Sequence, residues 1–377
     1  ERAGPRESLK IQKIVITHVR VPFVEPFRIS SGAVSEKDGI VVALHSDGLI
    51  GYGEASPMAG NFYSGDTPEI SWKELCEVIC PAIAGGEFEN PTDWNRALDG
   101  LRAGNFTKAG VETAFWDLAA QRQGKPLHEL LGGTRTRVES GLAVGLYDDV
   151  ADMLRTVERY LKCGYRRVKL KIEPGRDVEI VRAARKAFGE IPLYVDANGA
   201  YTLRDLTVFR ELDEFNLMMF EQPFPGSFLE ESAELQRQVR TPICLDESLD
   251  SIGQLRRAIE LGSLRIANFK IQRIGGFQHA LEMDAICREH GIPAWAGTMP
   301  ELGIGQAQGA ALASLNNFVY PTDVEASDRW FRDDIIYPFI QVQDGWIELP
   351  RTLGVGYQMN SAKIREYQLA TRSFPQS

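Results

Sequence analysis

The chain has 377 residues, a formal net charge of −10, and apolar and charged fractions of 44% and 25%. These fractions are near the averages of folded globular proteins, so disordered, collagen-like and coiled-coil classes gain no support, and the length suits a barrel of about 250 residues plus a smaller domain. Nucleic acids and anionic membranes attract basic surfaces, and an acidic chain without a long Lys/Arg cluster is therefore expected to bind neither.

Membrane and secretion signals are not seen in the sequence. No run approaches 18 apolar residues, and Glu1–Lys10 is charged rather than an apolar signal core. The five cysteines are odd in number and contain no CxxC pair, which argues against a disulfide framework or a zinc knuckle. These features predict a cytoplasmic protein.

The first third of the chain predicts a small α+β domain over residues 1–134. Apolar stretches at Ile11–Val21, Gly39–Ser46 and Leu49–Gly53 predict strands, and Asp47-Gly48 predicts a hairpin between the last two. Residues 68–86 and 107–132 show helical spacing of apolar residues. Strands followed by helices are typical of an α+β domain.

From about residue 138 short apolar strands alternate with amphipathic helices. The predicted strands are Gly141–Val144, Arg167–Ile172, Leu193–Asp196, Leu217–Glu221, Ile243–Asp246, Ile266–Lys270, Pro293–Ala296 and Phe318–Pro321. The predicted helices are Asp149–Cys163, Asp177–Phe188, Thr202–Leu212, Leu229–Val239, Ser251–Leu261 and Gly276–His290. Repeated βα units require parallel strands with right-handed crossovers, and about eight of them close into a barrel. A doubly wound open sheet is the alternative.

The barrel is expected to span residues 135–335, and residues 336–377 are expected to return to the small domain. Within that tail, Phe339–Arg351 contains Asp344-Gly345, which predicts one more hairpin.

Five ionisable residues end five successive predicted strands, at intervals of 25, 25, 25 and 24 residues. They are Lys171, Asp196, Glu221, Asp246 and Lys270. One βα unit has about that length, so equivalent positions recur at this interval and face the same end of a barrel. Three carboxylates are thus expected to meet at one mouth, with a lysine on each side.

The three carboxylates predict a magnesium site formed by Asp196, Glu221 and Asp246. A buried carboxylate loses its hydration unless it is paired or bound to a metal. Oxygen ligands without histidine suit Mg²⁺, with Mn²⁺ as a substitute, rather than zinc. A helix cap or a surface position would explain any single acid, but explains three at equal spacing poorly.

The lysines predict acid/base chemistry. A metal cation and partial burial depress a lysine pKa towards the working pH, where the amine can accept a proton. Lys171, nearest the strand end, is predicted to take the proton. Lys169 shares the same strand face and is predicted to lower its partner's pKa by repulsion, with a salt bridge to a neighbouring strand as the alternative.

Several segments resemble the muconate-lactonising branch of the enolase superfamily, and within it the o-succinylbenzoate synthase and N-succinylamino acid racemase family. These segments are Val168–Gly175, Val195–Asn198, Glu221–Pro223, Cys244–Ser248 and Lys270–Gly276. The resemblance covers about residues 11–357. It implies a modified (β/α)8 barrel of the (β/α)7β type with an N-terminal α+β capping domain. It also implies that Lys171 and Lys270 face each other across the substrate, with Asn198 and Glu247 supporting the metal ligands.

Finer features of the resemblance concern the substrate. Met58-Ala59-Gly60 and the following residues resemble the family's lid loop, in which Phe62 and Tyr63 are expected to cover the substrate. Arg273 is similar to the arginine of members that racemise N-succinylamino acids; a helix-start residue paired with an acid is its alternative. Lys169 and Asn198 are also expected to contact substrate. A strand-end loop adds three further substrate contacts, Thr298, Met299 and Pro300, although the family usually has glycine at the first of these and an aliphatic residue at the last.

The resemblance implies a lyase, an o-succinylbenzoate synthase of menaquinone biosynthesis, which performs a Mg²⁺-dependent syn dehydration of a small carboxylate through an enediolate. N-succinylamino acid racemase activity is a second expectation, as is a homo-oligomer. Asp323-Val324-Glu325, close to the D-x-D of dipeptide epimerases, keeps that activity as an alternative. An inactive barrel serving as a binding subunit is the alternative outside enzymes.

Overall fold

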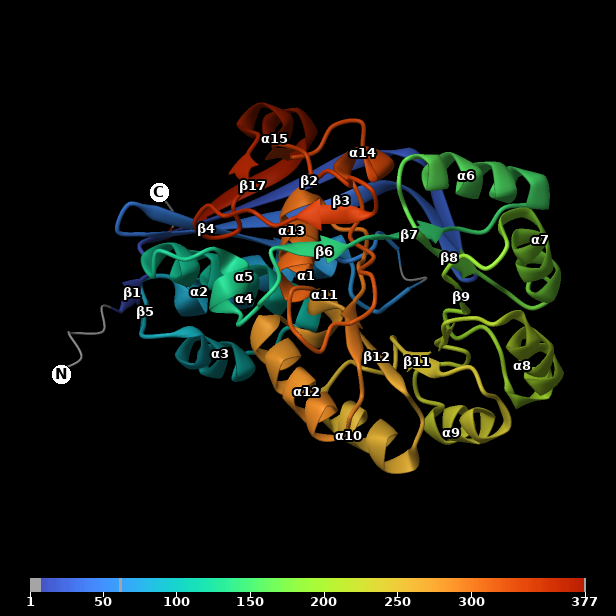
Figure 1. The fold of residues 1–377 in the computed structure, drawn as a ribbon. Helices are drawn as coiled ribbons and strands as arrows, with labels where there is room; N and C mark the ends of the chain where they lie inside the picture. Colours follow the sequence, from blue (N-terminus) through green and yellow to red (C-terminus); the bar gives the residue numbers. More distant parts are fainter. Residues whose placement is uncertain (1–7, 61–62, 376–377) are drawn as a thin grey trace.

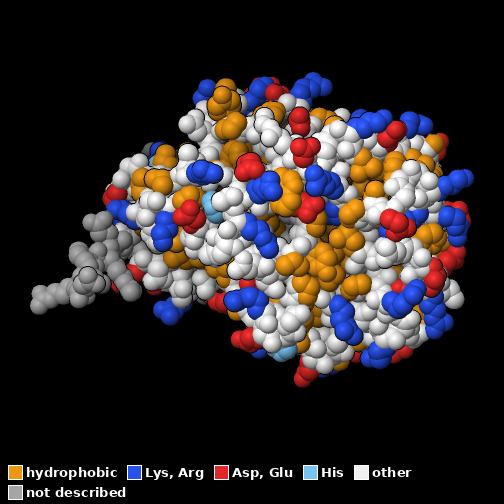
Figure 2. Space-filling model, in the orientation of Figure 1, with side chains coloured by type: hydrophobic (Ala, Val, Ile, Leu, Met, Phe, Trp, Pro, Cys, Tyr) orange, Lys and Arg blue, Asp and Glu red, His pale blue; other side chains and the backbone are white. Residues whose placement is uncertain are grey.

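The computed structural model describes residues 8–60 and 63–375. Within them, an antiparallel sheet with helices lies beside a barrel of parallel strands surrounded by helices (Figure 1). No helix in the described ranges combines the length and apolar character needed to cross a membrane. On the face shown in Figure 2, basic and acidic side chains are interspersed.

The capping domain is built on a four-stranded sheet of order β17-β2-β3-β4. Its strands are β2 (Lys13–Ile29), β3 (Gly32–Ser46), β4 (Leu49–Ala55) and β17 (Gln368–Phe374). Asp47 and Gly48 both have positive φ, 47° and 81°, as a type I′ hairpin turn requires. The predicted hairpin between β3 and β4 is therefore present.

The β2–β3 ribbon is longer than the sequence pattern indicates. Strand β2 continues beyond Val21 to Ile29, through a register shift between Pro22 and Phe27. Proline lacks the N–H needed for the ladder, which interrupts the strand signal. The far end of the ribbon lies against the barrel: Leu146 donates its N–H to Arg28, and Arg28 pairs with Asp148.

Helices cover the capping sheet. They are α1 (Pro68–Glu74), the π-helix η1 (Leu75–Ile79), α2 (Cys80–Ile83), α3 (Pro91–Asp99), α4 (Asn105–Arg122) and α5 (Leu127–Leu130). Two short strands, β1 (Leu9–Lys10) and β5 (Glu87–Phe88), pair beside them. Helix α4 lies directly on β4, where a Cβ at Gly53 would lie 2.1 Å from the carbonyl oxygen of Gly110. Glycine is required there because backbones meet. Helix α3, capped by Asn90, is an element that the sequence analysis missed.

The barrel contains seven parallel strands whose spatial order, β7 to β13, follows the chain without reversal. They are β7 (Gly141–Val144), β8 (Arg167–Lys171), β9 (Leu193–Asp196), β10 (Phe220–Glu221), β11 (Ile243–Leu245), β12 (Ile266–Phe269) and β13 (Ala294–Ala296). The helices are α6 (Val150–Lys162), α7 (Val178–Phe188), η2 (Leu203–Asp205), α8 (Leu206–Leu212), η3 (Asp213–Phe215), α9 (Leu229–Gln238), α10 (Ile252–Leu261), α11 (Ile271–Ile274), α12 (Phe277–Glu289) and α13 (Gly303–Leu312). A doubly wound sheet would reverse its strand order at a switch point, so the barrel prediction is confirmed.

The predicted eighth strand, Phe318–Pro321, is wrong as a regular strand. Single parallel bridges, Phe318 to Ala294 and Thr322 to Ser140, join this segment to the two edges of the sheet. Pro321 cannot donate to a ladder, which limits the pairing. The segment closes the barrel through these isolated contacts.

The C-terminal segment differs from the predicted hairpin. Asp344-Gly345 does form a tight turn with positive φ, closed by an antiparallel bridge between Gln343 and Trp346, but the hairpin extends no further, and β15 (Trp346–Glu348) pairs with β6 (Arg137–Glu139). The Arg137 guanidinium lies 4.5 Å from the centre of the Trp346 ring. The segment also contains β14 (Ile336–Tyr337) and β16 (Gln358–Met359), which pair, then α15 (Ser361–Tyr367) and β17; helix α14 (Ser327–Trp330) precedes it.

A buried carboxylate joins the two domains on the side of α12. Glu112 of α4 accepts the backbone N–H groups of Phe277 and Gln278, at 2.8 and 2.9 Å, and the indole N–H of Trp116 at 2.8 Å. The first helical N–H groups have no partner inside a helix, and a carboxylate satisfies them well. Glu112 therefore fixes how the capping domain meets the barrel.

Candidate active site

The five predicted ionisable residues lie together at the carboxyl ends of the barrel strands. Lys171, Asp196 and Glu221 end β8, β9 and β10, and lie opposite one another in register. Asp246 directly follows β11, and Lys270 directly follows β12. Parallel strands in register bring equivalent positions to one end of a barrel, which is why the regular sequence interval becomes a cluster in space.

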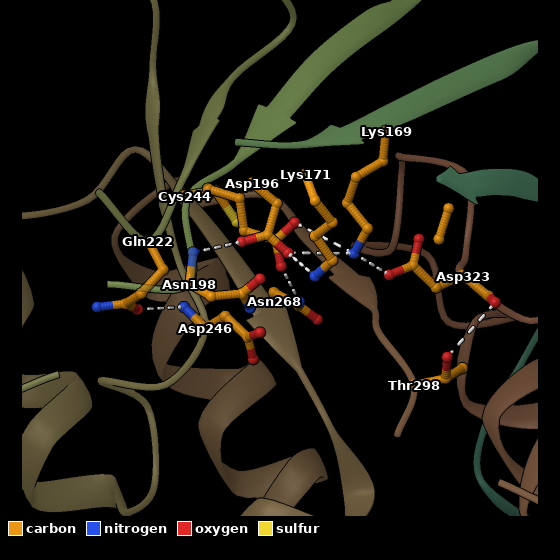
Figure 3. A network of polar contacts seen from close by, with 12 residues as sticks. Lys169, Lys171, Asp196, Asn198, Gln222, Cys244, Asp246, Asn268, Thr298 and Asp323 are labelled. Carbon is orange, nitrogen blue, oxygen red and sulfur yellow. Dashed lines mark hydrogen bonds and ion pairs between the residues drawn. The ribbon is translucent and has the colours of Figure 1, made fainter. Parts of the chain in front are cut away.

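Each carboxylate of the cluster contacts a basic side chain; Figure 3 shows Lys169 and Lys171 at Asp196. The Lys171 ammonium donates to Asp196 at 2.5 Å, and the Lys270 ammonium lies 2.8 Å from Asp246. Arg273 also donates to Asp246. The three acids are fully buried, so these cations offset charges that have lost their hydration.

The charges of the cluster shift the pKa values of Glu221 and Asp246 in opposite directions. Burial and the neighbouring Asp196 carboxylate raise the pKa of Glu221 to about 8. Burial alone would also raise that of Asp246, but Arg273 and Lys270 hold the pKa of Asp246 below its usual range. Burial lowers the pKa of Lys270, but the Asp246 carboxylate outweighs it and raises that pKa above its usual range. The pKa shift of Lys270 is therefore opposite to the direction expected from the sequence.

Lys169 lies within the carboxylate cluster. Its ammonium donates to Asp323 and lies 3.3 Å from Glu221 and 3.6 Å from Asp196. Burial lowers its pKa, but these acids, Asp323 first, raise the pKa of Lys169 well above its usual range. The structure thus shows the salt-bridge alternative.

The oxygen chemistry around the acids fits a hard cation. Asn198 donates to Glu247 at 2.9 Å, and Asn268 donates to Glu221 at 2.8 Å. The Oδ1 atoms of both asparagines and Oε2 of Glu247 are buried without a hydrogen-bond donor. Buried oxygen atoms that lack a hydrogen-bond donor can be satisfied by a positively charged group, such as a metal cation. Among residues 8–60 and 63–375, no group of three or more His, Cys, Asp or Glu side chains is arranged to hold a metal ion. In this structure the three carboxylates contact lysine and arginine side chains instead.

Four residues of this region were not predicted to act in the site. Gln222, with φ of 41°, accepts the N–H groups of Asp246 and Ser248 at 2.9 and 3.2 Å, and so orients the Asp246 segment. The others are Asn268, Asp323 and Arg167; Arg167 donates to Asp323 at 2.8 Å. A period of two links two of them to predicted positions, because Arg167 shares a strand face with Lys169 and Lys171, and Asn268 shares one with Lys270.

A small cavity lies against the two lysines. Its lining consists of Phe27, Ile29, Met58, Tyr63, Lys171, Lys270, Thr298, Met299 and Pro300. The volume open to the centres of water molecules is about 40 Å³, room for a few waters. Lys169 and Asn198, expected to contact substrate, are not part of this lining. Phe27 and Ile29 were missed because they lie on the unpredicted extension of β2.

Tyr63 covers the lysine side of the cavity. Its hydroxyl oxygen accepts a hydrogen bond from Lys270 at 2.9 Å and another from Arg273. The capping domain thus supplies one wall of the cavity, and the barrel supplies the charges. Phe62, expected to act beside Tyr63, lies outside the described residues.

Comparison with known proteins agrees with this geometry. The profile of the mandelate racemase / muconate lactonizing enzyme N-terminal domain matches residues 11–132, and the enolase C-terminal domain-like profile matches residues 152–363. The o-succinylbenzoate synthase of Geobacillus kaustophilus is 39% identical over 97% of this chain and 98% of its own. The N-succinylamino acid racemase of Thermus thermophilus is 38% identical over 97% and 99%. An enolase-superfamily structure from Listeria innocua has a TM-score of 0.92 and 34% identity, covering 97% of this chain and 99% of its own.

The barrel, its capping domain and the shared sequence place the chain in a defined class of enzymes: it belongs to the enolase superfamily, in the branch of mandelate racemase and muconate lactonizing enzyme. Within that branch its similarity is to the proteins named o-succinylbenzoate synthase and N-succinylamino acid racemase. The family predicted from the strand-end motifs is confirmed.

Proposed function

We propose that this chain is an o-succinylbenzoate synthase, which dehydrates a small carboxylate substrate in menaquinone biosynthesis. The observation that carries the proposal is the pair Lys171 and Lys270, which line one cavity from strands β8 and β12 beside three buried carboxylates. The relatives named for this activity add support over nearly the full chain. We also propose that the protein is cytoplasmic and that it forms a homo-oligomer.

Asp196, Glu221 and Asp246 would hold Mg²⁺, with Mn²⁺ as a substitute. When bound, the metal would supply positive charge that stabilises the enediolate form of the substrate carboxylate. The donor-free oxygens of Asn198 and Glu247 beside the acids support this assignment.

Lys171 would remove the α-proton and later protonate the departing hydroxide. A syn dehydration can use one amine for both transfers, because the proton and the hydroxide leave on the same face. Lys270, which lines the same cavity, would keep its positive charge near the enediolate.

N-succinylamino acid racemase activity is a second candidate, favoured by the placement of the two lysines in one cavity. Racemisation needs proton transfer on both faces of the α-carbon, and one lysine on each side provides it. The relative from Thermus thermophilus carries this name.

The dipeptide epimerase alternative is less well supported by the site. Asp323 is engaged by Arg167 and Lys169. Glu325 accepts the N–H of Ala143 at 2.6 Å and lies 3.2 Å from Arg329. Neither acid lines the cavity, so neither is placed to bind a dipeptide there.

Assays on both substrates, side by side, test the proposal. We expect the purified protein to form o-succinylbenzoate, EDTA to abolish the activity, and Mg²⁺ or Mn²⁺ to restore it, because the carboxylate cluster would otherwise lack its cation. Full activity after rigorous chelation would contradict the mechanism. Thermal stabilisation by Mg²⁺ without turnover on either substrate would favour the inactive barrel.

The lid predicts a separate effect on substrate affinity. Tyr63→Gly should raise KM about tenfold to hundredfold, because burying an aromatic side chain is worth about 1.5–3 kcal/mol and the ring excludes water from the lysines. Mg²⁺ affinity, measured by calorimetry, should stay within threefold. Tyr337→Gly, at a tyrosine that is 66% exposed, is the matched control; equal kinetic effects of both variants would show that Tyr63 does not cover the substrate.

A further inference from the structure

A buried lysine outside the carboxylate cluster joins the lid to the barrel. Lys37 of β3 is 1% exposed. Its ammonium donates to the carbonyl oxygen of Ser56 at 2.9 Å and to that of Met299 at 3.1 Å, and lies 3.7 Å from the sulfur of Met58. Ser56 and Met58 begin the lid loop in the capping domain, and Met299 belongs to the barrel loop after β13. One ammonium therefore ties together two loops from different domains.

The loops that Lys37 joins form the wall of the cavity. Met58 and Met299 both line it, together with the neighbours of Met299, Thr298 and Pro300. Met58 and Met299 also pack in one small apolar cluster with Phe106. A displacement of either loop would therefore change the shape of the cavity without moving the carboxylates.

The segment that Lys37 holds is fixed from the other side by Gln272. Its side chain accepts the N–H of Ser56 at 2.9 Å and donates to the carbonyl of Glu54 at 2.8 Å. Gln272 lies two residues after Lys270. The start of the lid is thus held between Lys37 and the helix that follows Lys270.

Glu54 extends this connection to α13. Its carboxylate accepts the N–H groups of Leu302 and Gly305, each at 2.8 Å, and the hydroxyl of Ser56 at 2.9 Å. These N–H groups lie at the start of α13, and the barrel loop that contains Met299 directly precedes this helix. Both ends of the contact made by Lys37 are therefore anchored.

The ammonium is an expensive choice for a purely structural contact. Among the described residues the Lys37 ammonium contacts two carbonyl oxygens and a sulfur and forms no ion pair with a carboxylate, although Glu301 and Glu54 act on it electrostatically. Burying an ion without a paired charge destabilises the folded protein, and an apolar side chain of equal size in its place is often as stable or more stable. What an apolar side chain cannot do is hold two carbonyl groups at a fixed separation.

We propose that Lys37 is a positioning residue that locks the start of the lid, Ser56–Met58, to the loop Thr298–Pro300 and so sets the apolar wall against which the substrate packs. The inference rests on the proposed function for its kinetic part, since it assigns to Lys37 a share of substrate affinity. Lys37 does not line the cavity and acts through the two loops.

Lys37→Met tests the proposal, because it keeps length and apolar volume and removes the donor. We expect KM to rise about tenfold or more, kcat to stay within threefold, and Mg²⁺ affinity to be unchanged. Hydrogen exchange should become faster at the amides of Ser56, Met58, Ala59, Gly60, Thr298 and Met299 and remain slow in α4. The exchange measurement needs no turnover, so a wild-type protein inactive on both substrates would remove the proposed function and leave this test intact.

Glu112→Gln is the matched control, since Glu112 is another buried inter-domain contact, made to the start of α12 and not to the lid. It should lower the unfolding temperature and leave KM unchanged. If both variants raise KM equally, or if Lys37→Met changes neither KM nor exchange in the two loops, Lys37 only supports the fold. Should Lys37→Met not fold, Lys37→Gln, whose shorter amide can reach one carbonyl, is expected to give the same changes at smaller size; its failure to do so would equally overturn the proposal.

Discussion

Lys171→Ala is expected to abolish dehydration, with a loss of at least about 10²–10⁴-fold, the usual contribution of a positioned acid or base. The variant should still exchange the α-proton of one enantiomer of an N-succinylamino acid with deuterium, because Lys270 still lines the cavity. Lys270→Ala should stop racemisation and leave exchange on the opposite enantiomer. Dehydration should also fall, since the Lys270 ammonium offsets the charge of the enediolate.

Proton nuclear magnetic resonance in D₂O, with each enantiomer supplied separately, measures these exchange rates. Lys162→Ala, which removes a lysine from the exposed face of α6, controls for the loss of a positive charge. If either active-site variant racemised at the wild-type rate, the assignment of the two lysines would be wrong. Both variants retain a cation beside their acid, Lys169 at Asp196 and Arg273 at Asp246, so folded protein is expected for the measurement.

Glu221→Gln is expected to lower Mg²⁺ affinity at least about a hundredfold and kcat/KM by several orders of magnitude. The substitution keeps the shape of the side chain and removes one of three negative charges, and hard divalent cations depend on carboxylate ligands. The loss of the metal's charge stabilisation is worth several kcal/mol in the transition state. Titration calorimetry with Mg²⁺ and steady-state kinetics provide the two measurements.

Asp323→Asn is the matched control for this prediction. Asp323 is buried like Glu221 and contacts the same lysine, Lys169, but is not one of the proposed ligands. We expect its effect on Mg²⁺ affinity to stay below tenfold. Equal losses of affinity in both variants would mean that the total charge around Lys169, and not ligation by Glu221, governs metal binding.

The regular parts of the chain were predictable because local patterns determine them. The barrel strands from β7 to β13 were found within a few residues, since short apolar runs followed by amphipathic helices have few other solutions. The regular eighth strand was wrong, and the C-terminal hairpin is limited to one bridge between Gln343 and Trp346. Pairing partners decide both outcomes: Thr322 bridges Ser140, and β15 pairs with β6. A short segment pairs with whichever strand the rest of the fold leaves unpaired beside it. Sequence periodicity carries no information about which strand that is.

By itself, the sequence determined which residues stand at the strand ends, because one βα unit has nearly constant length and returns Lys171, Asp196, Glu221, Asp246 and Lys270 to one end of the barrel. Tertiary structure alone decided which charges meet and what covers them. Lys169 lies among the acids, and Asn268 and Asp323 join it. The cavity wall comes from elements far apart in the chain, with Tyr63 and Lys37 reaching from the capping domain. Contacts between distant segments depend on how whole domains pack, and no local pattern records that packing.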